Sequence, residues 1–414
     1  MRLVIIGSGI AGHRACRSAL ESREDLEVIL VSKEVFPLYS PCVLPHYLAG
    51  QIPRDRLFLP ADYEAVGGRV LFRMGTKVVG IDPARKSVLL AGEMLSYDRL
   101  ILALGGYSVT PRIPGVDLPG VFHFKTLTDV DELIKWPAKR VVVVGSGPMG
   151  IEAALALNMR GMKVCLVEAM DRLLPAVLDV YPARIVQDSL LKAGIEVMVD
   201  EQVLSLEGQG RVEAVQTDKR RIPADAVVLT AGIRPAIDIA EEIGIEIGPK
   251  GGIVTDAFMR TSDPSIWACG DCVESFDAVT GLRALSMLWP NAVAQGSVAG
   301  INAAGGNKIY AGSFSFVTIN LLDTFVFSFG PPFEASAECT VAEKTSRRGY
   351  ARFLMKEKRL VGAQIIGDDS WTGITSSVLN RDRVSISGTS LKKHLIFQML
   401  YSNKLTKLVS SLAG

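Results

Sequence analysis

Cys42 lies in the stretch "LYSPCVLPHYLAG" (residues 38–50), directly after Pro41 and before a run that is predicted to be a helix. Pro41 has no backbone N–H and disfavours helix in the residue before it, so the chain turns at this point. A cysteine in the first turn after such a break lies near unpaired N–H groups and the positive end of a helix dipole, which favours a thiolate. The alternative is a small apolar side chain that fills the core. The segment alone leaves both interpretations open.

A glycine motif near the N-terminus predicts a dinucleotide site. The run "LVIIGSGIAG" ends a strand in Gly7, Gly9 and Gly12; the helical run "ACRSALES" and the strand "LEVILVSKE" follow. In such a unit the first glycine makes the turn, the second lets the backbone approach a pyrophosphate, and the third lets helix and strand pack closely. The acidic residue expected after the second strand is replaced by Ser32, with Glu34 two residues on. Either Ser32 or Glu34 would hold the adenosine ribose.

The same unit occurs a second time, in "RVVVVGSGPMGIEAALALNMRGMKVCLVEAMDRLLP". Its glycines are Gly145, Gly147 and Gly150, and Glu168 ends the second strand 23 residues after Gly145. A carboxylate about 20 residues after the first glycine suits the ribose 2′-hydroxyl of NADH. Because that carboxylate repels a 2′-phosphate, NADH is favoured over NADPH, a preference that the nearby Arg172 weakens. Two complete units predict two bound nucleotides.

The order of the segments predicts that one nucleotide domain is inserted in the other. The runs "LILALGGYSVTPRIPG" (100–115) and "AVVLTAGIRPAIDIAEEIG" (226–244) are predicted crossovers between domains, and the second glycine motif lies between them. The later run "TSDPSIWACGDCVES" is an apolar strand expected to return to the first sheet. The predicted fold class is α/β, with two Rossmann-like domains, the NADH domain inserted in the first, and a small α+β C-terminal domain. The predicted bounds are 1–111 and 229–305 for the first domain, 112–228 for the inserted one and 306–414 for the C-terminal one.

Two patterns characterise residues 306–414. The run "YARFLMKEKRLVGAQIIGD" alternates like an antiparallel hairpin with "KEKR" as its turn. The tail "LKKHLIFQMLYSNKLTKLVSSL" has the spacing of an amphipathic helix. Packing on its own domain is favoured over docking to a partner.

Composition excludes several function classes. The chain has 414 residues, and 45 basic against 44 acidic residues give a net charge of +1, so nothing favours nucleic-acid binding. No apolar run approaches the roughly 20 residues of a membrane helix, and the opening "MRLVIIGSG" leaves no room for a signal peptide. Six scattered cysteines do not form a disulfide framework, which predicts a reducing cytoplasm. Four histidines without ligand spacing predict no metal site.

With these segments assembled, the chain resembles the FAD-dependent pyridine nucleotide–disulfide oxidoreductases. Within them it is most similar to the single-cysteine branch of NADH oxidases, coenzyme A-disulfide reductases and polysulfide reductases. The resemblance runs over about residues 1–305 and rests on "GSGIAG", "GSGPMGIE", "AGIRP", "ACGDCVE" and "PNAVAQGSVAGINAAG". It implies FAD in the first domain and NADH in the inserted one.

The resemblance also implies roles for residues outside the first glycine motif. Gly270 and Asp271 belong to the FAD site, and Asp271 matches the aspartate that binds the ribityl chain. Asn291 falls where the N-terminus of the following helix meets the flavin pyrimidine, a place suited to negative charge. Val78 matches the position whose backbone meets the adenine.

At the NADH site the resemblance implies that Glu152 lies close to the nicotinamide and that Gly232 of "AGIRP" binds the nucleotide. Pro148 replaces the aromatic residue that often gates this site, which implies a more open flavin face. Ile10 stands where the peroxidase and oxidase members carry a histidine, and His13 beyond it is expected to be packed. This departure favours disulfide-type acceptors over peroxide.

Cys42 is the closest functional match, because "SPCVLPHYLAG" is similar to the "SPCALPY" motif of the single-cysteine branch. In that branch the cysteine lies over the flavin and alternates between a thiolate and a mixed disulfide or sulfenic acid. A flavin takes a hydride from NADH and passes the electron pair to sulfur, which a lone thiol cannot do unaided. Cys42 is therefore predicted to be redox-active, against the alternative of an idle thiol. Cys269 and Cys272 are interpreted as two small residues around a flavin ligand.

The sequence thus predicts an FAD-dependent enzyme that passes electrons from NADH, through FAD and Cys42, to a small disulfide, polysulfide or oxygen acceptor. The alternative is an NADH-linked electron-transfer flavoprotein that reduces a rubredoxin, ferredoxin or iron–sulfur protein. A cytoplasmic protein with no membrane span is expected, and the resemblance implies that its C-terminal domain could form a homodimer, although the sequence leaves the oligomeric state open.

Overall fold

The computed structural model describes residues 1–60, 69–322, 324–330, 340–346, 349–356 and 359–367. The chain forms two compact units, each assembled from three separate stretches. Unit 1 comprises Met1–Ser40, Asp55–Tyr107 and Arg234–Ser315; unit 2 comprises Pro41–Arg54, Ser108–Ile233 and Phe316–Gly414. The predicted domain bounds at residues 111, 228 and 305 stay predictions.

The first glycine motif opens a parallel five-stranded sheet in unit 1, with the order β19-β7-β1-β2-β3. Strand β19 comes after the second glycine motif in sequence, yet it pairs with β7 in the first sheet, which confirms the nested α/β fold. The elements are β1 (Arg2–Ile6), α1 (Ile10–Ser22), β2 (Glu27–Val31), β3 (Arg69–Arg73), β7 (Arg99–Leu102) and β19 (Ile266–Ala268).

The described residues of unit 1 also form two small sheets and the helices α6 and α7. One antiparallel sheet has the order β4-β5-β6, and a mixed one has the order β18-β20-β21. Their bounds, with those of the helices, are β4 (Val78–Asp82), β5 (Ser87–Leu90), β6 (Glu93–Ser96), β18 (Ile253–Val254), β20 (Val273–Phe276), β21 (Arg283–Leu285), α6 (Asp238–Glu242) and α7 (Trp289–Ala303).

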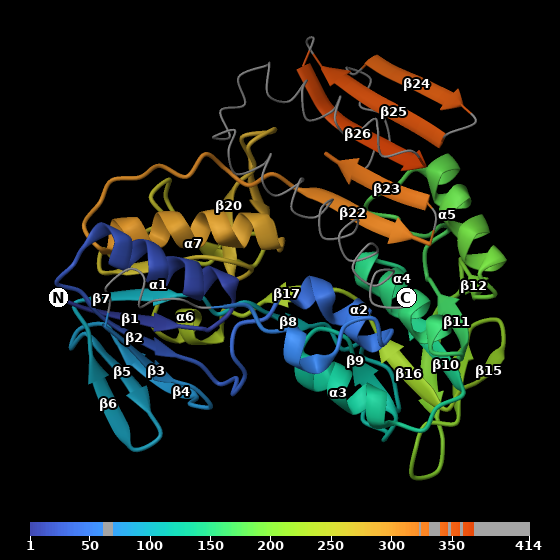
Figure 1. The fold of residues 1–414 in the computed structure, drawn as a ribbon, viewed down its shortest axis with the longest axis horizontal. Helices are drawn as coiled ribbons and strands as arrows, with labels where there is room; N and C mark the ends of the chain where they lie inside the picture. The colour runs from blue at the N-terminus through green and yellow to red at the C-terminus, as the bar shows by residue number, and fades with distance from the viewer. Residues whose placement is uncertain (61–68, 323, 331–339, 347–348, 357–358, 368–414) are drawn as a thin grey trace, which may run out of the picture. The chain divides into compact units, whose positions relative to one another are not determined.

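Helices α1 and α7 lie side by side because α7 presents glycines to α1 (Figure 1). A Cβ added at Gly296 would lie 2.3 Å from the carbonyl oxygen of Ala11, and one at Gly300 would lie 2.1 Å from that of Ala15. The Ser18 hydroxyl donates to that of Ser297 at 3.2 Å beside them. Since residue numbers rise together along both helices, the two helices run parallel and their N-termini point the same way.

Unit 2 contains the second glycine motif in a parallel sheet with the order β12-β11-β10-β16-β9. Unit 2 also contains an antiparallel sheet with the order β13-β14-β15, whose strands fall between β12 and β16 in the sequence. The bounds are β9 (Val121–His123), α3 (Leu127–Lys135), β10 (Arg140–Val144), α4 (Pro148–Met159), β11 (Lys163–Val167), α5 (Val180–Lys192), β12 (Glu196–Met198), β13 (Val203–Glu207), β14 (Ala214–Thr217), β15 (Arg221–Pro223) and β16 (Ala226–Leu229).

Short elements mark the places where the chain passes from one unit to the other. Strands β8 (Gly106–Ser108) and β17 (Ile233–Pro235) pair as a two-stranded sheet at two of these passages. The others lie next to the 3-10 helix η1 (Pro41–Val43), at the 3-10 helix η2 (Arg54–Arg56) and before β22. Between η1 and η2 lies the five-residue helix α2 (Leu44–Leu48).

Among its described residues, unit 2 also forms an antiparallel sheet with the order β22-β23-β26-β25-β24, which packs on helices α4 and α5. The predicted hairpin forms as β25 and β26, although residues 357–358 of its turn, like the tail predicted to be an amphipathic helix, lie outside the described residues. The bounds are β22 (Phe316–Leu321), β23 (Thr324–Phe329), β24 (Thr340–Ser346), β25 (Gly349–Lys356) and β26 (Arg359–Gly367).

We expect Gly300→Ala to destabilise the protein, because the new Cβ must displace the backbone of Ala15. Overpacking of this kind costs about 1–3 kcal/mol, which predicts a fall in Tm of roughly 5 °C. Gly147→Ala is the matched control, because no atom lies within 4 Å of a Cβ there and the backbone is extended. Thermal unfolding of the FAD-loaded protein without NADH measures both. Equal losses of Tm would contradict the close approach of α1 and α7.

Candidate functional site

The first glycine loop is shaped by contacts that leave no room for side chains. Gly7 adopts a φ of +113°, and a Cβ there would lie 2.0 Å from the carbonyl oxygen of Ala103. A Cβ at Gly12 would lie 1.9 Å from the carbonyl oxygen of Gly7. By contrast, no atom lies within 4 Å of a Cβ at Gly9, the N-cap of α1. The loop is therefore closed towards the core and open at the helix N-terminus, as a pyrophosphate requires.

The N-terminus of α7 extends beyond that of α1 in the same direction. Gly296 of α7 contacts Ala11 of α1. Seven residues of α7 precede Gly296, whereas one residue of α1 precedes Ala11, so α7 extends six residues further. At 1.5 Å per residue this is an offset of about 9 Å. Unit 1 thus presents two helix N-termini in succession, each able to stabilise negative charge.

Gly270 and Asp271 lie in the turn between β19 and β20, and Gln295 of α7 holds this turn. The side-chain oxygen of Gln295 accepts the Gly270 N–H at 2.8 Å. The side-chain nitrogen of Gln295 points to the hydroxyls of Ser275 and Ser313 at 3.3 and 3.4 Å. Gln295 is only 1% exposed. The same helix whose N-terminus is offered to a ligand therefore also fixes the predicted ribityl-binding turn.

The side chain of Asn291 links two segments of unit 1 by hydrogen bonds. Its side-chain nitrogen donates to Ser286 and to the carbonyl of Phe314 (3.0 Å), and its oxygen accepts the Phe314 N–H at 3.1 Å. These hydrogen bonds join the first turn of α7 to Phe314, which precedes β22. Val78, the predicted adenine contact, begins β4 and pairs with Leu90 of β5.

The two candidates for the ribose of the first nucleotide differ in what they already bond. The Ser32 hydroxyl accepts the Ser8 hydroxyl at 2.7 Å and the Glu34 N–H at 3.1 Å, and Ser32 is buried. The Glu34 carboxylate makes no hydrogen bond or ion pair with any residue in the described part of the chain. Ser32 therefore shapes the loop, whereas Glu34 retains its acceptor capacity.

The second glycine loop repeats the geometry of the first. Gly145 has a φ of +102°, and a Cβ at Gly150 would lie 2.1 Å from its carbonyl oxygen. A Cβ added at Gly145 would meet Thr230, just as one at Gly7 would meet Ala103. The Thr230 hydroxyl donates to the carbonyls of Val144 and Gly145 at 2.9 and 2.8 Å. Gly147, at the N-terminus of α4, again has no atom within 4 Å of an added Cβ.

Glu168 is buried and bonded within this loop. One carboxylate oxygen accepts the Ser146 N–H at 2.9 Å and the Ser146 hydroxyl at 2.6 Å, and the other accepts the Met170 N–H at 2.9 Å. Arg172 points elsewhere, donating to Asp171 at 2.8 Å and to the carbonyl of Leu178 at 3.0 Å. The described contacts thus place a negative charge at the loop and keep the nearest arginine engaged.

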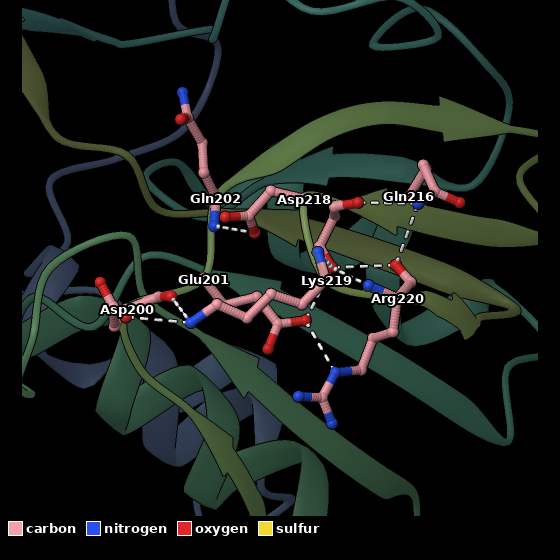
Figure 2. Close-up of polar contacts among 8 residues, drawn as sticks. Asp200, Glu201, Gln202, Gln216, Asp218, Lys219 and Arg220 are labelled. Atoms are coloured by element: carbon pink, nitrogen blue, oxygen red, sulfur yellow. Dashed lines mark hydrogen bonds and ion pairs between the residues drawn. The ribbon is translucent and has the colours of Figure 1, made fainter.

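A cluster of polar residues (Figure 2) is hydrogen-bonded to the backbone of residues 168–170. Glu201, 2% exposed, accepts the Thr217 hydroxyl at 2.7 Å and pairs with Arg220 at 3.1 Å. The Glu201 N–H donates to the carbonyl of Glu168 at 3.0 Å, and the Asp200 N–H donates to that of Met170 at 2.7 Å. Lys219 pairs with Asp200 at 3.0 Å at the edge of the cluster.

Glu152 lies in the first half of α4, partly buried. Burial raises the pKa of its carboxyl to about 8, so the group is mostly protonated at neutral pH. Gly232 is exposed between β16 and β17, and its carbonyl accepts the Val109 N–H at 2.9 Å.

Cys42 is the exposed cysteine among those that the structure describes, and it lies in η1 directly before α2. Cys16, Cys165, Cys269 and Cys272 are buried. Burial raises the pKa of Cys165 and Cys272 to about 12 and that of Cys269 well above its ordinary value, so these thiols stay protonated.

His13 is packed, as expected. It is 6% exposed and stacks on Phe72 with ring centroids 6.3 Å apart. Burial lowers its pKa to about 4, so the imidazole is neutral at neutral pH.

The described residues lack two features that mark other protein classes, a membrane-spanning helix and a metal-binding cluster. None of their helices combines the length and apolar character needed to cross a bilayer. Over the same ranges, no cluster of three or more His, Cys, Asp or Glu side chains could hold a metal ion.

Two glycine loops, each open at a helix N-terminus, together with a nested Rossmann architecture, define a protein that binds two dinucleotides. A family comparison matches residues 1–296 to "Pyridine nucleotide-disulphide oxidoreductase". The chain belongs to this family, and the resemblance noted in the sequence is confirmed. The cofactors of the family, FAD and a nicotinamide dinucleotide, fit the two open loops, and the chain is an NAD(P)H-dependent oxidoreductase.

Individual relatives support the same conclusion. The chain is 37% identical over 317 residues to the NADH oxidase of Methanocaldococcus jannaschii, covering 74% of this chain and 70% of that one. It is 29% identical to the assimilatory nitrate reductase electron transfer subunit of Bacillus subtilis, covering 95% of this chain and 51% of that one. Among solved structures, an NAD-dependent persulfide reductase from A. fulgidus superposes with a TM-score of 0.85 at 28% identity, covering 95% of this chain and 77% of that one.

Sequence reasoning missed several residues of these sites. Ser146 could have been found, because it lies inside the "GSG" motif next to its partner's strand. Gln295 and Thr230 lie inside quoted runs and Glu201 does not, but the pairing of each with a residue distant in sequence leaves no signal in the sequence.

We predict that the pH dependence of stability reports the raised pKa of Glu152. Between its ordinary value near 4.5 and the folded value of about 8, the folded protein binds a proton that the unfolded chain does not, so stability falls as pH rises through this window. Glu152→Gln removes this loss. Its Tm should match wild type at pH 5 and exceed it by about 5 °C or more at pH 9. Parallel Tm profiles of the two FAD-loaded proteins would contradict a raised pKa.

Proposed function

We propose that the protein oxidises NADH and reduces a small disulfide, polysulfide or oxygen acceptor through Cys42. The observation that carries the proposal is the exposure of Cys42 in the "SPC" turn, while the other described cysteines are buried. The similarity to an NADH oxidase and a persulfide reductase supports acceptors of this kind.

In this proposal the glycine loops and helix N-termini of unit 1 hold FAD, with Gly7, Gly9 and Gly12 at the pyrophosphate and Asp271 at the ribityl chain. Glu34 binds the ribose, since Ser32 is already bonded within the loop. In unit 2, Gly145, Gly147, Gly150 and Gly232 hold the nicotinamide dinucleotide. The roles of Val78, Gly270 and Asn291 are those implied by the family.

Bound FAD supplies an acceptor for the NADH hydride and a source of two electrons for sulfur. The Cys42 thiolate attacks a disulfide acceptor, forming a mixed disulfide and releasing one thiolate. Two electrons and one proton then convert the mixed disulfide to the Cys42 thiolate and a second thiol, so the cycle closes. Glu152, protonated at neutral pH, can donate a hydrogen bond to the nicotinamide amide oxygen.

A second candidate function is electron transfer to an iron–sulfur protein such as a rubredoxin or ferredoxin. It is supported by the similarity, over 95% of this chain, to an electron transfer subunit of nitrate reductase. In that case Cys42 is idle. For either function we infer a cytoplasmic location, in keeping with the described cysteines, which are present as thiols, and a homodimer, as the family resemblance implies.

An anaerobic titration with NADH separates the two candidate functions. After oxidation of Cys42, wild type should consume more than one NADH per flavin and develop a long-wavelength absorbance from thiolate and flavin. Cys42→Ser should stop at one NADH without that band, whereas Cys165→Ala, which removes a buried thiol, should behave as wild type. If wild type and Cys42→Ser give the same stoichiometry and spectrum, Cys42 is idle and a protein acceptor is favoured.

We propose a preference for NADH over NADPH, because Glu168 is buried at the loop and Arg172 is engaged with Asp171 and Leu178. We expect kcat/KM for NADH to exceed that for NADPH by about tenfold or more. Glu168→Gln should narrow the ratio several-fold. Glu207→Gln neutralises an exposed carboxylate paired with Arg221 in the same unit and should leave the ratio unchanged. A ratio that does not respond to Glu168→Gln would contradict the electrostatic explanation.

A further inference from the structure

The segment that carries Cys42, Pro41–Arg54, is fastened to a helix of unit 2 by one carboxylate. Asp131 of α3 accepts the Tyr47 hydroxyl at 2.7 Å. It also accepts from two nitrogens of Arg54, from Nη2 at 2.8 Å and from Nε at 3.1 and 3.2 Å. Tyr47 and Arg54 lie on either side of the turn that follows α2. A single side chain therefore holds the segment at two points.

A second tie comes from α4, the helix that begins at the second glycine loop. Arg160, at its C-terminal end, donates from Nη1 to the carbonyl of Leu48 at 2.9 Å. This carbonyl belongs to the last residue of α2 and lacks a partner within its own helix. Helix α2 contacts both α3 and α4 (Figure 1).

The local sequence cannot hold this segment in place by itself. The helix α2 has five residues and η1 has three, far fewer than a helix needs to be stable alone. The partners of Asp131 are 84 and 77 residues away in the sequence, so the ties are tertiary contacts. The position of Cys42 within unit 2 thus depends on contacts made beyond its own segment.

Asp131 is suited to this holding role at neutral pH. Its side chain is 16% exposed, against 43% for Arg54. Burial by itself would raise the pKa of Asp131, but the hydrogen bonds from Arg54 and Tyr47 outweigh it and hold the pKa below its ordinary value. The carboxylate is therefore ionised, and the two-pronged arginine contact fixes direction as well as distance.

We propose that Asp131 is a positioning residue. It holds the Cys42 segment, Pro41–Arg54, against the rest of unit 2 and so sets the position from which Cys42 reacts. The catalytic half of this inference rests on the proposed redox role of Cys42. The mechanical half, that Asp131 holds the segment, does not.

The test compares Asp131→Asn and Tyr47→Phe with the matched control Asp225→Asn in FAD-loaded enzyme. Asp225 lies in the same unit, pairs with Arg140 at 2.7 Å and is 30% exposed, and its pKa is lowered to about 2, mainly by that pair. After reduction with dithiothreitol and its removal, the rate of Cys42 alkylation by iodoacetamide is followed by mass spectrometry of the peptide that contains Cys42.

We expect Asp131→Asn to accelerate Cys42 alkylation about twofold or more, because release of the segment increases the access that iodoacetamide already has to this exposed thiol. Tyr47→Phe should have a smaller effect in the same direction, since the Arg54 contacts remain. Asp225→Asn should leave the rate at the wild-type value even if its Tm falls. With a disulfide acceptor, Asp131→Asn should lower kcat about tenfold or more while KM for NADH stays within about twofold.

Equal alkylation rates in wild type and Asp131→Asn would overturn the proposal, as would equal acceleration by Asp131→Asn and Asp225→Asn. The redox role of Cys42 fails separately. If Cys42→Ser retains full turnover, the proposed function is wrong, while the alkylation contrast still decides whether Asp131 holds the segment.

Discussion

Both nucleotide sites depend on a contact that is possible only where a Cβ is missing. The carbonyl of Gly7 approaches Gly12, and the carbonyl of Gly145 approaches Gly150, so closely that any side chain would occupy the same space. This contact brings each helix N-terminus directly over the end of its strand. This contact therefore fixes the open N-caps Gly9 and Gly147. It also fixes the loops that bond to Ser32 and Glu168 after the second strands.

The two loops share a frame and differ in charge. In each, the serine between the first two glycines bonds to the residue after the second strand: Ser8 to Ser32, and Ser146 to Glu168. The first pair is neutral, whereas the second buries a carboxylate. One geometry thus provides two electrostatic environments, and in the second loop the buried Glu168 carboxylate is part of the frame.

Patterns of short range were readable from the sequence, and pairings of long range were not. Strand and glycine spacing predicted both Rossmann units, the returning strand β19 and the hairpin of β25 and β26. The contact of Gln295 with Gly270 and that of Asp131 with Tyr47 and Arg54 join residues 25 to 84 positions apart. Such pairs leave no periodic signal, because only the folded backbone brings them together.

The discontinuous make-up of the two units has a consequence for the order in which they assemble during synthesis. The sheet of unit 1 lacks its edge strand β19 until Ala268 has been made, and α1 lacks its partner α7 until Ala303 has been made. The inserted sheet is complete in sequence once β16 ends at Leu229. Because chains fold as they emerge, the inserted sheet can close while the N-terminal half-domain still waits for its second half. A ribosome-bound chain whose first 240 residues have emerged would therefore hold a folded insert between unfinished flanks.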